Sequence, residues 1–182
     1  MIIGITGTNG SGKGTVVEYL KKTGFRHYSA SGFIAEEVKR RGLPINRDTL
    51  NEVGTDLRRT HHPTYIIQTL YERAYADGRD AIIEAVRGVA GAQMLKERGA
   101  ILLAVDADRR VRYEKVVKRG SEKDHVSFER FCEQEDRELE QNEEFAMNIN
   151  GVMKIADYTF QNNGTLQGLH AQIDKVFSEI KK

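Results

Sequence analysis

Residues 1–15, MIIGITGTNGSGKGT, decide the fold of this chain. The apolar run over residues 2–6 predicts a buried strand, and it leads into a loop with four glycines. A helix follows, with Val16, Val17 and Leu20 on one face. Such glycines let consecutive backbone N–H groups point at one anion, and the start of a helix adds positive potential. The order of strand, loop and helix therefore predicts a phosphate-binding loop, or P-loop.

The loop carries one lysine, Lys13, which is placed to reach the outer phosphates of a nucleotide as a mobile positive charge. A glycine-rich turn with an exposed lysine is the alternative, but the flanking strand and helix disfavour it. The hydroxyls of Thr6 and Ser11 fit phosphate contact and local backbone contact equally well. We expect the loop to bind the phosphates of a nucleotide through Gly7, Asn9, Gly10, Ser11, Gly12, Lys13, Gly14 and Thr15.

The composition is that of one globular domain over residues 1–182. Charged residues make up 30% and the formal net charge is +1, so the chain lacks the basic field typical of nucleic-acid-binding proteins. The single cysteine, Cys132, has no internal disulfide partner, and no apolar run approaches the about 18 residues of a membrane-spanning helix. We therefore expect a cytoplasmic protein, a monomer or weak dimer, that binds neither membranes nor nucleic acids.

Strand-like runs alternate with amphipathic helices along the rest of the chain. This alternation requires right-handed crossovers, so it predicts an α/β fold with a parallel sheet of about five strands and helices on both faces. The expected strands cover residues 2–6, 25–29, 81–85, 100–106 and 157–161.

A long insertion, about residues 31–78, separates the second and third expected strands. Its pattern predicts three helices, which begin after Ser31, after Asn46 and at Pro63. A crossover needs far less chain than this. The insertion is therefore either decoration of the sheet or a helical unit that closes over a substrate.

A second insertion, about residues 108–142, follows the fourth strand. We expect Asp108 to cap a helix that runs to Arg119, then a polar loop over residues 120–125 and another helix over about 127–142. Two helices joined by a charged loop are typical of a lid, although an ordinary surface hairpin has the same pattern.

The residue after Lys13 indicates a particular class of P-loop. The usual loop has Ser or Thr there to ligate Mg²⁺, whereas this chain has Gly14 and then Thr15. This variant resembles the adenylate kinase branch, the nucleoside monophosphate kinases. The resemblance implies a P-loop kinase fold, ATP as phosphate donor, a small phosphorylated acceptor, and Mg²⁺ that keeps much of its water beside Thr15.

The segment after the third expected strand, Glu84-Ala85-Val86-Arg87, resembles the monophosphate kinase element D-G-F-P-R. A carboxylate that ends a buried parallel strand lies near the P-loop, so Glu84 either holds the water shell of Mg²⁺ or caps the next helix. Arg87 matches the arginine of that element. The resemblance implies that Arg87 binds the acceptor phosphate and is catalytic with Lys13.

Further acceptor contacts are expected in the first insertion. Adenylate kinases have an element like T-G-x-x-L-R after the second strand, and Ser31 with Gly32 matches its start. Its arginine is missing here, because that place holds Ala35 or Glu36. Arg58 is the candidate for a second phosphate contact, with a surface ion pair to Asp56 or Glu52 as the alternative.

Four basic residues in the second insertion are candidates for the site. Lys115 and Arg119 share one helix face and resemble the kinase pattern R-x-x-x-R, which implies that Lys115 lies beside the adenine and Arg119 binds the donor triphosphate catalytically. Arg130 and Arg137 lie one heptad apart, Arg130 as an acceptor contact and Arg137 as a catalytic residue. Ion pairs with neighbouring glutamates are the alternative for both.

Asn163 follows the fifth expected strand, where related kinases contact adenine, although a tight-turn role fits it equally well.

The function that this pattern favours is transfer of the ATP γ-phosphate to a nucleoside or deoxynucleoside monophosphate. Two alternatives stay open. The chain's last third also resembles dephospho-coenzyme A kinase, but the carboxylate base that a hydroxyl acceptor needs is missing from residues 29–31. A nucleotide-operated ATPase or assembly factor on the same scaffold is the other.

Overall fold

The computed structural model describes residues 1–120, 126–139 and 145–180. Five parallel strands form one sheet in the order β2-β3-β1-β4-β5, so the predicted α/β fold with a five-stranded parallel sheet is confirmed. The strands are β1 (Ile2–Gly7), β2 (Arg26–Ser29), β3 (Ala81–Glu84), β4 (Ile101–Asp106) and β5 (Tyr158–Gln161). The helices are α1 (Lys13–Lys22), α2 (Ala30–Arg40), α3 (Arg47–Thr60), α4 (Tyr65–Asp77), α5 (Val89–Glu97), α6 (Arg109–Arg119), α7 (Phe128–Leu139), α8 (Ile149–Lys154) and α9 (Leu166–Ile180).

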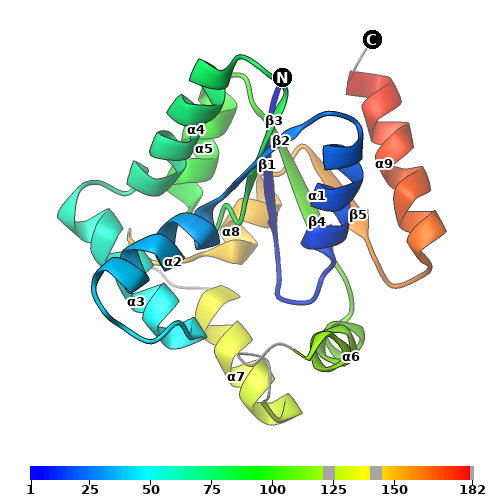
Figure 1. The fold of residues 1–182 in the computed structure, drawn as a ribbon. Coiled ribbons are helices and arrows are strands. Elements are labelled where there is room, and N and C mark those ends of the chain that lie inside the picture. Colours follow the sequence, from blue (N-terminus) through cyan, green and yellow to red (C-terminus); the bar gives the residue numbers. More distant parts are fainter. Residues whose placement is uncertain (121–125, 140–144, 181–182) are drawn as a thin grey trace.

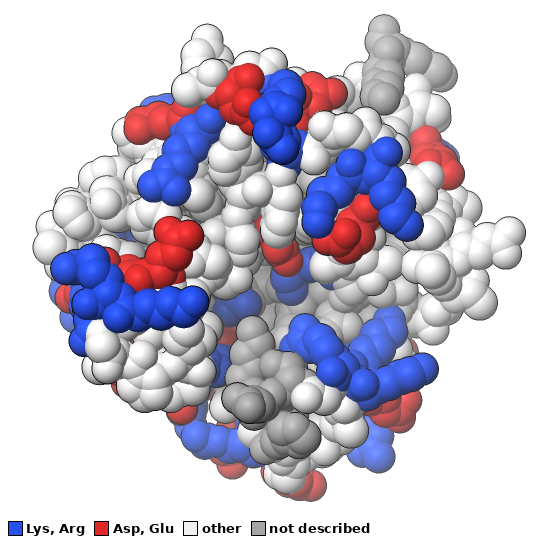
Figure 2. Space-filling model, in the orientation of Figure 1, with Lys and Arg blue, Asp and Glu red and all other residues white. Residues whose placement is uncertain are grey.

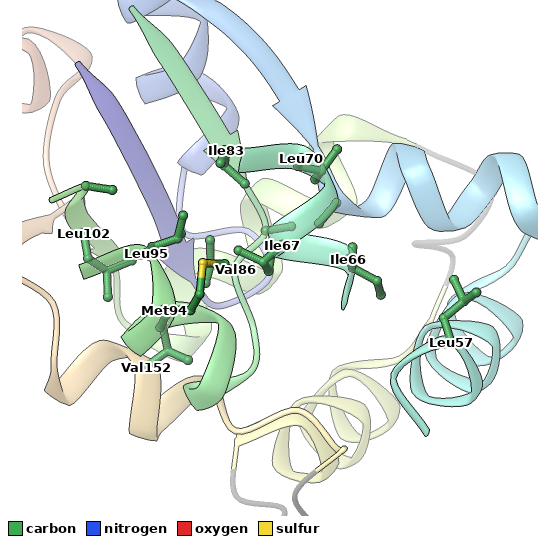
Figure 3. Close-up of a cluster of buried hydrophobic side chains, with 14 of the residues drawn as sticks. Leu57, Ile66, Ile67, Leu70, Ile83, Val86, Met94, Leu95, Leu102 and Val152 are labelled. Carbon is green, nitrogen blue, oxygen red and sulfur yellow. The ribbon is translucent and has the colours of Figure 1, made fainter. Parts of the chain in front are cut away.

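Helices cover both faces of the sheet, and each face has its own hydrophobic core (Figure 1). Because side chains alternate along a strand, Ile82 of β3 packs toward α1 and α9 while its neighbour Ile83 packs toward α4 and α5. Figure 3 shows the second of these cores, where Leu70 of α4 and Leu95 of α5 converge with Ile83. The three inner strands, β1, β3 and β4, are buried on both faces, as expected for a parallel sheet with helices on each side, whereas the edge strands β2 and β5 are more exposed.

The sheet order places the P-loop at the point where the chain changes direction. β1 is the central strand, with β3 on one side and β4 on the other. The chain builds the sheet first on the β3 side and then on the β4 side, so the strand order reverses at β1. Ligands of open parallel sheets bind beyond the carboxyl ends of the strands at such a point. The P-loop follows β1 there, and α2, α3, α6 and α7 surround the same end of the sheet (Figure 1).

Several boundaries differ from the expected ones. The first inserted helix begins at Ala30, before Ser31, because the Ser29 hydroxyl accepts a hydrogen bond from the Gly32 N–H at 3.1 Å and caps it. Asp108 occupies the N-cap position of α6, as expected, but its carboxylate makes no capping hydrogen bond and instead accepts one from the Asn163 amide at 3.1 Å.

Two further differences concern the second half of the chain. The short helix α8 was not expected from the sequence. The helix expected over residues 127–142 is described as Phe128–Leu139, and most of the preceding polar loop and residues 140–142 lie outside the described part of the chain. In the part that is described, no helix combines the length and the apolar character needed to cross a membrane.

Candidate functional site

The backbone of the P-loop packs closely against its surroundings. At Gly10 and Gly12 there is no room for a residue with a side chain. Gly10 and Gly12 both have positive φ, at 76° and 102°. A Cβ on Gly12 would lie 2.1 Å from the Asn162 amide nitrogen, and one on Gly10 would lie 2.4 Å from the Arg112 carbonyl oxygen. The loop is thus supported from two sides, by the segment after β5 and by α6.

Lys13 is held inside this loop. Its ammonium donates hydrogen bonds to the carbonyl oxygens of Gly7 at 2.8 Å and Thr8 at 2.6 Å. Burial, followed by the positive charge of Arg87, lowers the pKa of Lys13 to about 7, although the carboxylates of Glu84 and Glu138 act in the opposite direction. Lys13 is therefore a half-buried cation whose charge the nearby carboxylates do not fully compensate.

A cavity of about 620 Å³ opens beside the loop. On the face shown in Figure 2, lysine and arginine side chains surround a hollow that has acidic and basic groups at its floor. The cavity brings together most of the residues that the sequence predicted for the site. Those that line it are Asn9, Gly10, Gly12, Lys13, Gly14, Thr15, Ser31, Arg58, Glu84, Arg87, Lys115 and Arg119.

Five predicted residues do not line the cavity, and three of them belong to the loop and the segment that supports it. Gly7 and Ser11 face each other beneath the loop, where the Ser11 hydroxyl is buried without a hydrogen-bond partner among the described residues. Asn163 exchanges hydrogen bonds with Asp108, at 2.7 and 3.1 Å. Its neighbour Asn162 lines the cavity instead, and the Asn162 amide donates to the Ser11 carbonyl oxygen at 2.8 Å.

The other two are Arg130 and Arg137, on α7. Arg130 forms an ion pair with Glu133 at 3.0 Å, with both side chains largely exposed, which is the simpler alternative expected for it. Arg137 lies on the exposed side of the same helix. Neither arginine lines the cavity, so their participation stays a prediction.

One side of the cavity is formed by α6 and the segment after β5. The Lys115 ammonium donates to the Asn162 carbonyl oxygen at 2.6 Å, and Arg119 donates to the Asn9 side-chain oxygen at 3.4 Å. Arg112, one turn before Lys115, is almost fully buried and forms a bidentate ion pair with Glu135 of α7. Arg112 therefore connects the P-loop, α6 and α7.

The opposite side carries three arginines, Arg47, Arg58 and Arg87, which we call the arginine clamp. Arg58 donates to the Phe145 carbonyl oxygen at 2.6 Å, not to the acidic neighbours that the sequence suggested. Burial, and then the charge of Arg87, lower the pKa of Arg58 to about 10, so the guanidinium groups lie close enough to repel one another. Three guanidinium groups that lie close together despite this repulsion form a binding site for an anion.

Glu84 ends β3 at the floor of the cavity. It accepts a hydrogen bond from His27 at 2.8 Å. Burial raises the pKa of the Glu84 carboxyl, but the His27 hydrogen bond and the charges of His27, Lys13 and Arg87 outweigh this and lower its pKa overall. With Thr15 it offers the hard oxygen ligands that Mg²⁺ prefers, so these two side chains fit a hydrated Mg²⁺ ion between them and the phosphates.

Sequence reasoning missed Arg47, Glu138 and Arg112. Arg47 had a signal: it opens a helix, where the helix dipole disfavours a cation, so another partner has to explain it. Glu138 follows Phe131 and Glu135 at spacings of seven and three residues, which puts two carboxylates on the buried face of α7. The sequence does not reveal this buried face, because two of its residues are glutamates and most of their neighbours on the helix are charged as well.

Comparison with known proteins agrees with this architecture. A family model described as an AAA domain matches residues 3–144. TT1252 from Thermus thermophilus superposes with a TM-score of 0.67 at 22% identity, over 98% of this chain and 97% of that one. A shikimate kinase from Acinetobacter baumannii gives 0.66 at 15% identity, over 99% and 93%, and a dephospho-CoA kinase from Campylobacter jejuni gives 0.52 at 18%, over 98% and 96%. At these identities the likeness shows the fold, which is a P-loop kinase fold.

Relatives in sequence extend over the whole chain. A UPF0200 protein of Pyrococcus horikoshii is 32% identical, over 99% of this chain and 97% of its own length. Another, from Thermococcus kodakarensis, is 29% identical over 99% and 98%. The chain therefore belongs to the AAA domain family and is a member of the UPF0200 proteins.

Proposed function

We propose that this protein is a phosphotransferase that moves the γ-phosphate of ATP to a nucleoside or deoxynucleoside monophosphate. The observation that carries the proposal is the arginine clamp, which faces the same cavity as Lys13 from the opposite side. A monophosphate bound there would bring its phosphate oxygens toward the γ-phosphate held by the P-loop. Phosphoryl transfer depends chiefly on such alignment and on neutralising charge.

The charges in the cavity favour a phosphate acceptor over a hydroxyl acceptor. A hydroxyl needs a base to take its proton, and among the described residues that line the cavity Glu84 is the one carboxylate. Its lowered pKa makes it a weak base. A phosphate oxygen needs no base, and three arginines suit its charge. This argues against the dephospho-coenzyme A kinase alternative.

The parts of the site then have separate tasks. Lys13 and the backbone of the P-loop bind the outer phosphates of ATP, while Arg119 and Lys115 approach the donor from α6. Arg87 and Arg58 hold the acceptor phosphate, with Ser31 at the start of α2 beside them. When bound, Mg²⁺ would neutralise donor phosphate charge, with Thr15 and Glu84 orienting its water.

The insertions fit this division of labour. We propose that α2, α3 and α4 bind the acceptor and that α6 and α7 form the lid. The first three helices and α6 contribute residues to the cavity, and α7 is joined to α6 by the Arg112–Glu135 ion pair. ATP consumption should be measured with a panel of ribo- and deoxyribonucleoside monophosphates, with dephospho-coenzyme A, and with no acceptor. Acceleration by a monophosphate supports the proposal.

Other outcomes of the same assay overturn it. Transfer to dephospho-coenzyme A alone would assign the hydroxyl chemistry. ATP hydrolysis that no small acceptor accelerates would favour an ATPase that works with a macromolecular partner.

A further inference from the structure

A carboxylate from α7 lies inside the arginine clamp. Glu138 is 2% exposed, and it accepts hydrogen bonds from Arg47 at 2.6 Å and from Arg87 at 3.2 Å. Asn51 of α3 adds a longer contact at 3.4 Å. The two carboxylate oxygens are divided between the two arginines, so one anionic group binds two members of the arginine clamp at once.

These contacts are the ones that a phosphate would make. A carboxylate and a phosphate both offer anionic oxygens in pairs, and such a pair can be shared between two guanidinium groups, as the oxygens of Glu138 are. Burial alone would raise the pKa of Glu138, but the charge of Arg87 and the hydrogen bond from Arg47 outweigh it and lower its pKa. Glu138 is therefore an anion held where the clamp needs one.

One carboxylate does not satisfy the clamp. The Nη2 atom of Arg47 is buried and has no hydrogen-bond partner among the described residues. Arg58 donates to a neutral carbonyl oxygen and, at 3.4 Å, to the Thr55 hydroxyl. A buried guanidinium N–H without an acceptor is unfavourable, so the clamp has capacity for an anion with more charge and more oxygens than Glu138.

We propose that Glu138 is an internal substitute for the acceptor phosphate, and that an acceptor binds by displacing it from Arg47 and Arg87. The identity of the incoming group rests on the proposed function. Glu138 then sets specificity by competition: a phosphate dianion brings extra charge and oxygens to the clamp, whereas a monoanionic carboxylate gains nothing over Glu138. The displaced end of α7 moves, while Glu135 keeps the preceding turn on Arg112.

Titration calorimetry with inorganic phosphate tests this, with the P-loop saturated by Mg²⁺ and a non-hydrolysable ATP analogue. Glu138→Gln removes the competing charge, so it should bind phosphate about tenfold more tightly than wild type. Acetate, which wild type should not bind detectably, should bind to Glu138→Gln. Glu133→Gln, on the exposed side of the same helix, is the matched control and should behave as wild type.

Adding Arg87→Ala to Glu138→Gln should abolish the gain in phosphate affinity, which would show that the phosphate binds in the arginine clamp. If Glu138→Gln fails to fold, Glu138→Asp keeps the charge but withdraws it from the arginines, and it should give a smaller gain. A folded Glu138→Gln protein that binds phosphate no more tightly than wild type would overturn the proposal. Phosphate binding requires no turnover, so this outcome is separate from failure of the transfer assay.

Discussion

Glu135 and Glu138 lie one helical turn apart on α7, and their buried carboxylates bind arginines on opposite sides of the cavity. Glu135 binds Arg112, which supports the P-loop through the Asn9 carbonyl oxygen at 3.4 Å. Glu138 binds Arg87 on the other side. One helix thus joins the proposed donor side to the proposed acceptor side through ion pairs, and each pair can be tested separately.

The Arg112–Glu135 pair should stabilise the fold. Glu135→Gln leaves a buried arginine without its carboxylate, so the free energy of unfolding should fall by about 3–5 kcal/mol in urea titrations followed by circular dichroism. The double variant Arg112→Met with Glu135→Leu should recover much of this loss. Glu114→Gln, from an exposed pair with Arg110 on α6, should change it by less than about 0.5 kcal/mol. A similarly small loss for Glu135→Gln would show that the pair does not stabilise the fold.

Lys13 should be essential for phosphate transfer but not for folding. Lys13→Met removes the charge that we expect on the outer phosphates, so transfer should be abolished while the unfolding midpoint stays at or above that of wild type. The midpoint should not fall, because the variant no longer buries an ammonium group. A variant that turns over near the wild-type rate, with unchanged ATP affinity, would remove the P-loop lysine from the mechanism.

The lowered pKa of Lys13 predicts that ATP binding takes up a proton. At pH 8, above its pKa of about 7, the lysine of the free protein is mostly neutral. A triphosphate beside it favours the ammonium form, which raises the pKa and draws in about one proton. Calorimetry at pH 8 in buffers of different ionisation enthalpy measures this uptake. Lys13→Met should lack it, and at pH 6 the difference between the two proteins should shrink. Equal proton uptake by both proteins at pH 8 would contradict the assignment.

Arg119 should act more on the rate than on binding. In the proposed mechanism Arg119, beside the P-loop, stabilises the negative charge that develops on the transferred phosphate in the transition state. Arg119→Ala should therefore lower kcat by about 10²-fold or more, with a smaller effect on ATP affinity. Lys118→Ala, at the exposed neighbouring position, is the control. If both variants have the same kcat as wild type, Arg119 is not catalytic.

The sequence predicted the sheet and the P-loop because their signals are local. An apolar run followed by glycines and a helix has few other solutions, and the expected strand over residues 81–85 differs from β3 by one residue. The arginine clamp is different, because it forms where α3, which packs against α2 and α4, brings Arg47 and Arg58 to the same cavity as Arg87 from the segment after β3. No short sequence pattern predicts that residues from such distant parts of the chain lie together.

The segment after β5 shows how finely neighbouring residues differ. Asn162 and Asn163 are chemically identical, and the pattern after the fifth strand favoured Asn163 as a neighbour of adenine or as a tight-turn residue. The backbone turns Asn162 toward the P-loop, where it meets Gly12, and Asn163 toward Asp108. Which of two adjacent side chains faces a cavity depends on the exact end of β5, and sequence patterns do not locate strand ends to one residue.

Kinetics of Arg87→Ala test the central claim most directly. With the monophosphate that wild type uses best, the variant should show a strongly raised KM for the acceptor and a lowered kcat, because the buried acceptor phosphate loses a guanidinium partner. ATP hydrolysis without acceptor should barely change, and Arg79→Ala, far from the cavity beside Asp77, should match wild type. If no monophosphate accelerates ATP consumption by wild type, or if Arg87→Ala leaves the acceptor KM and kcat unchanged, the proposed monophosphate kinase function is contradicted.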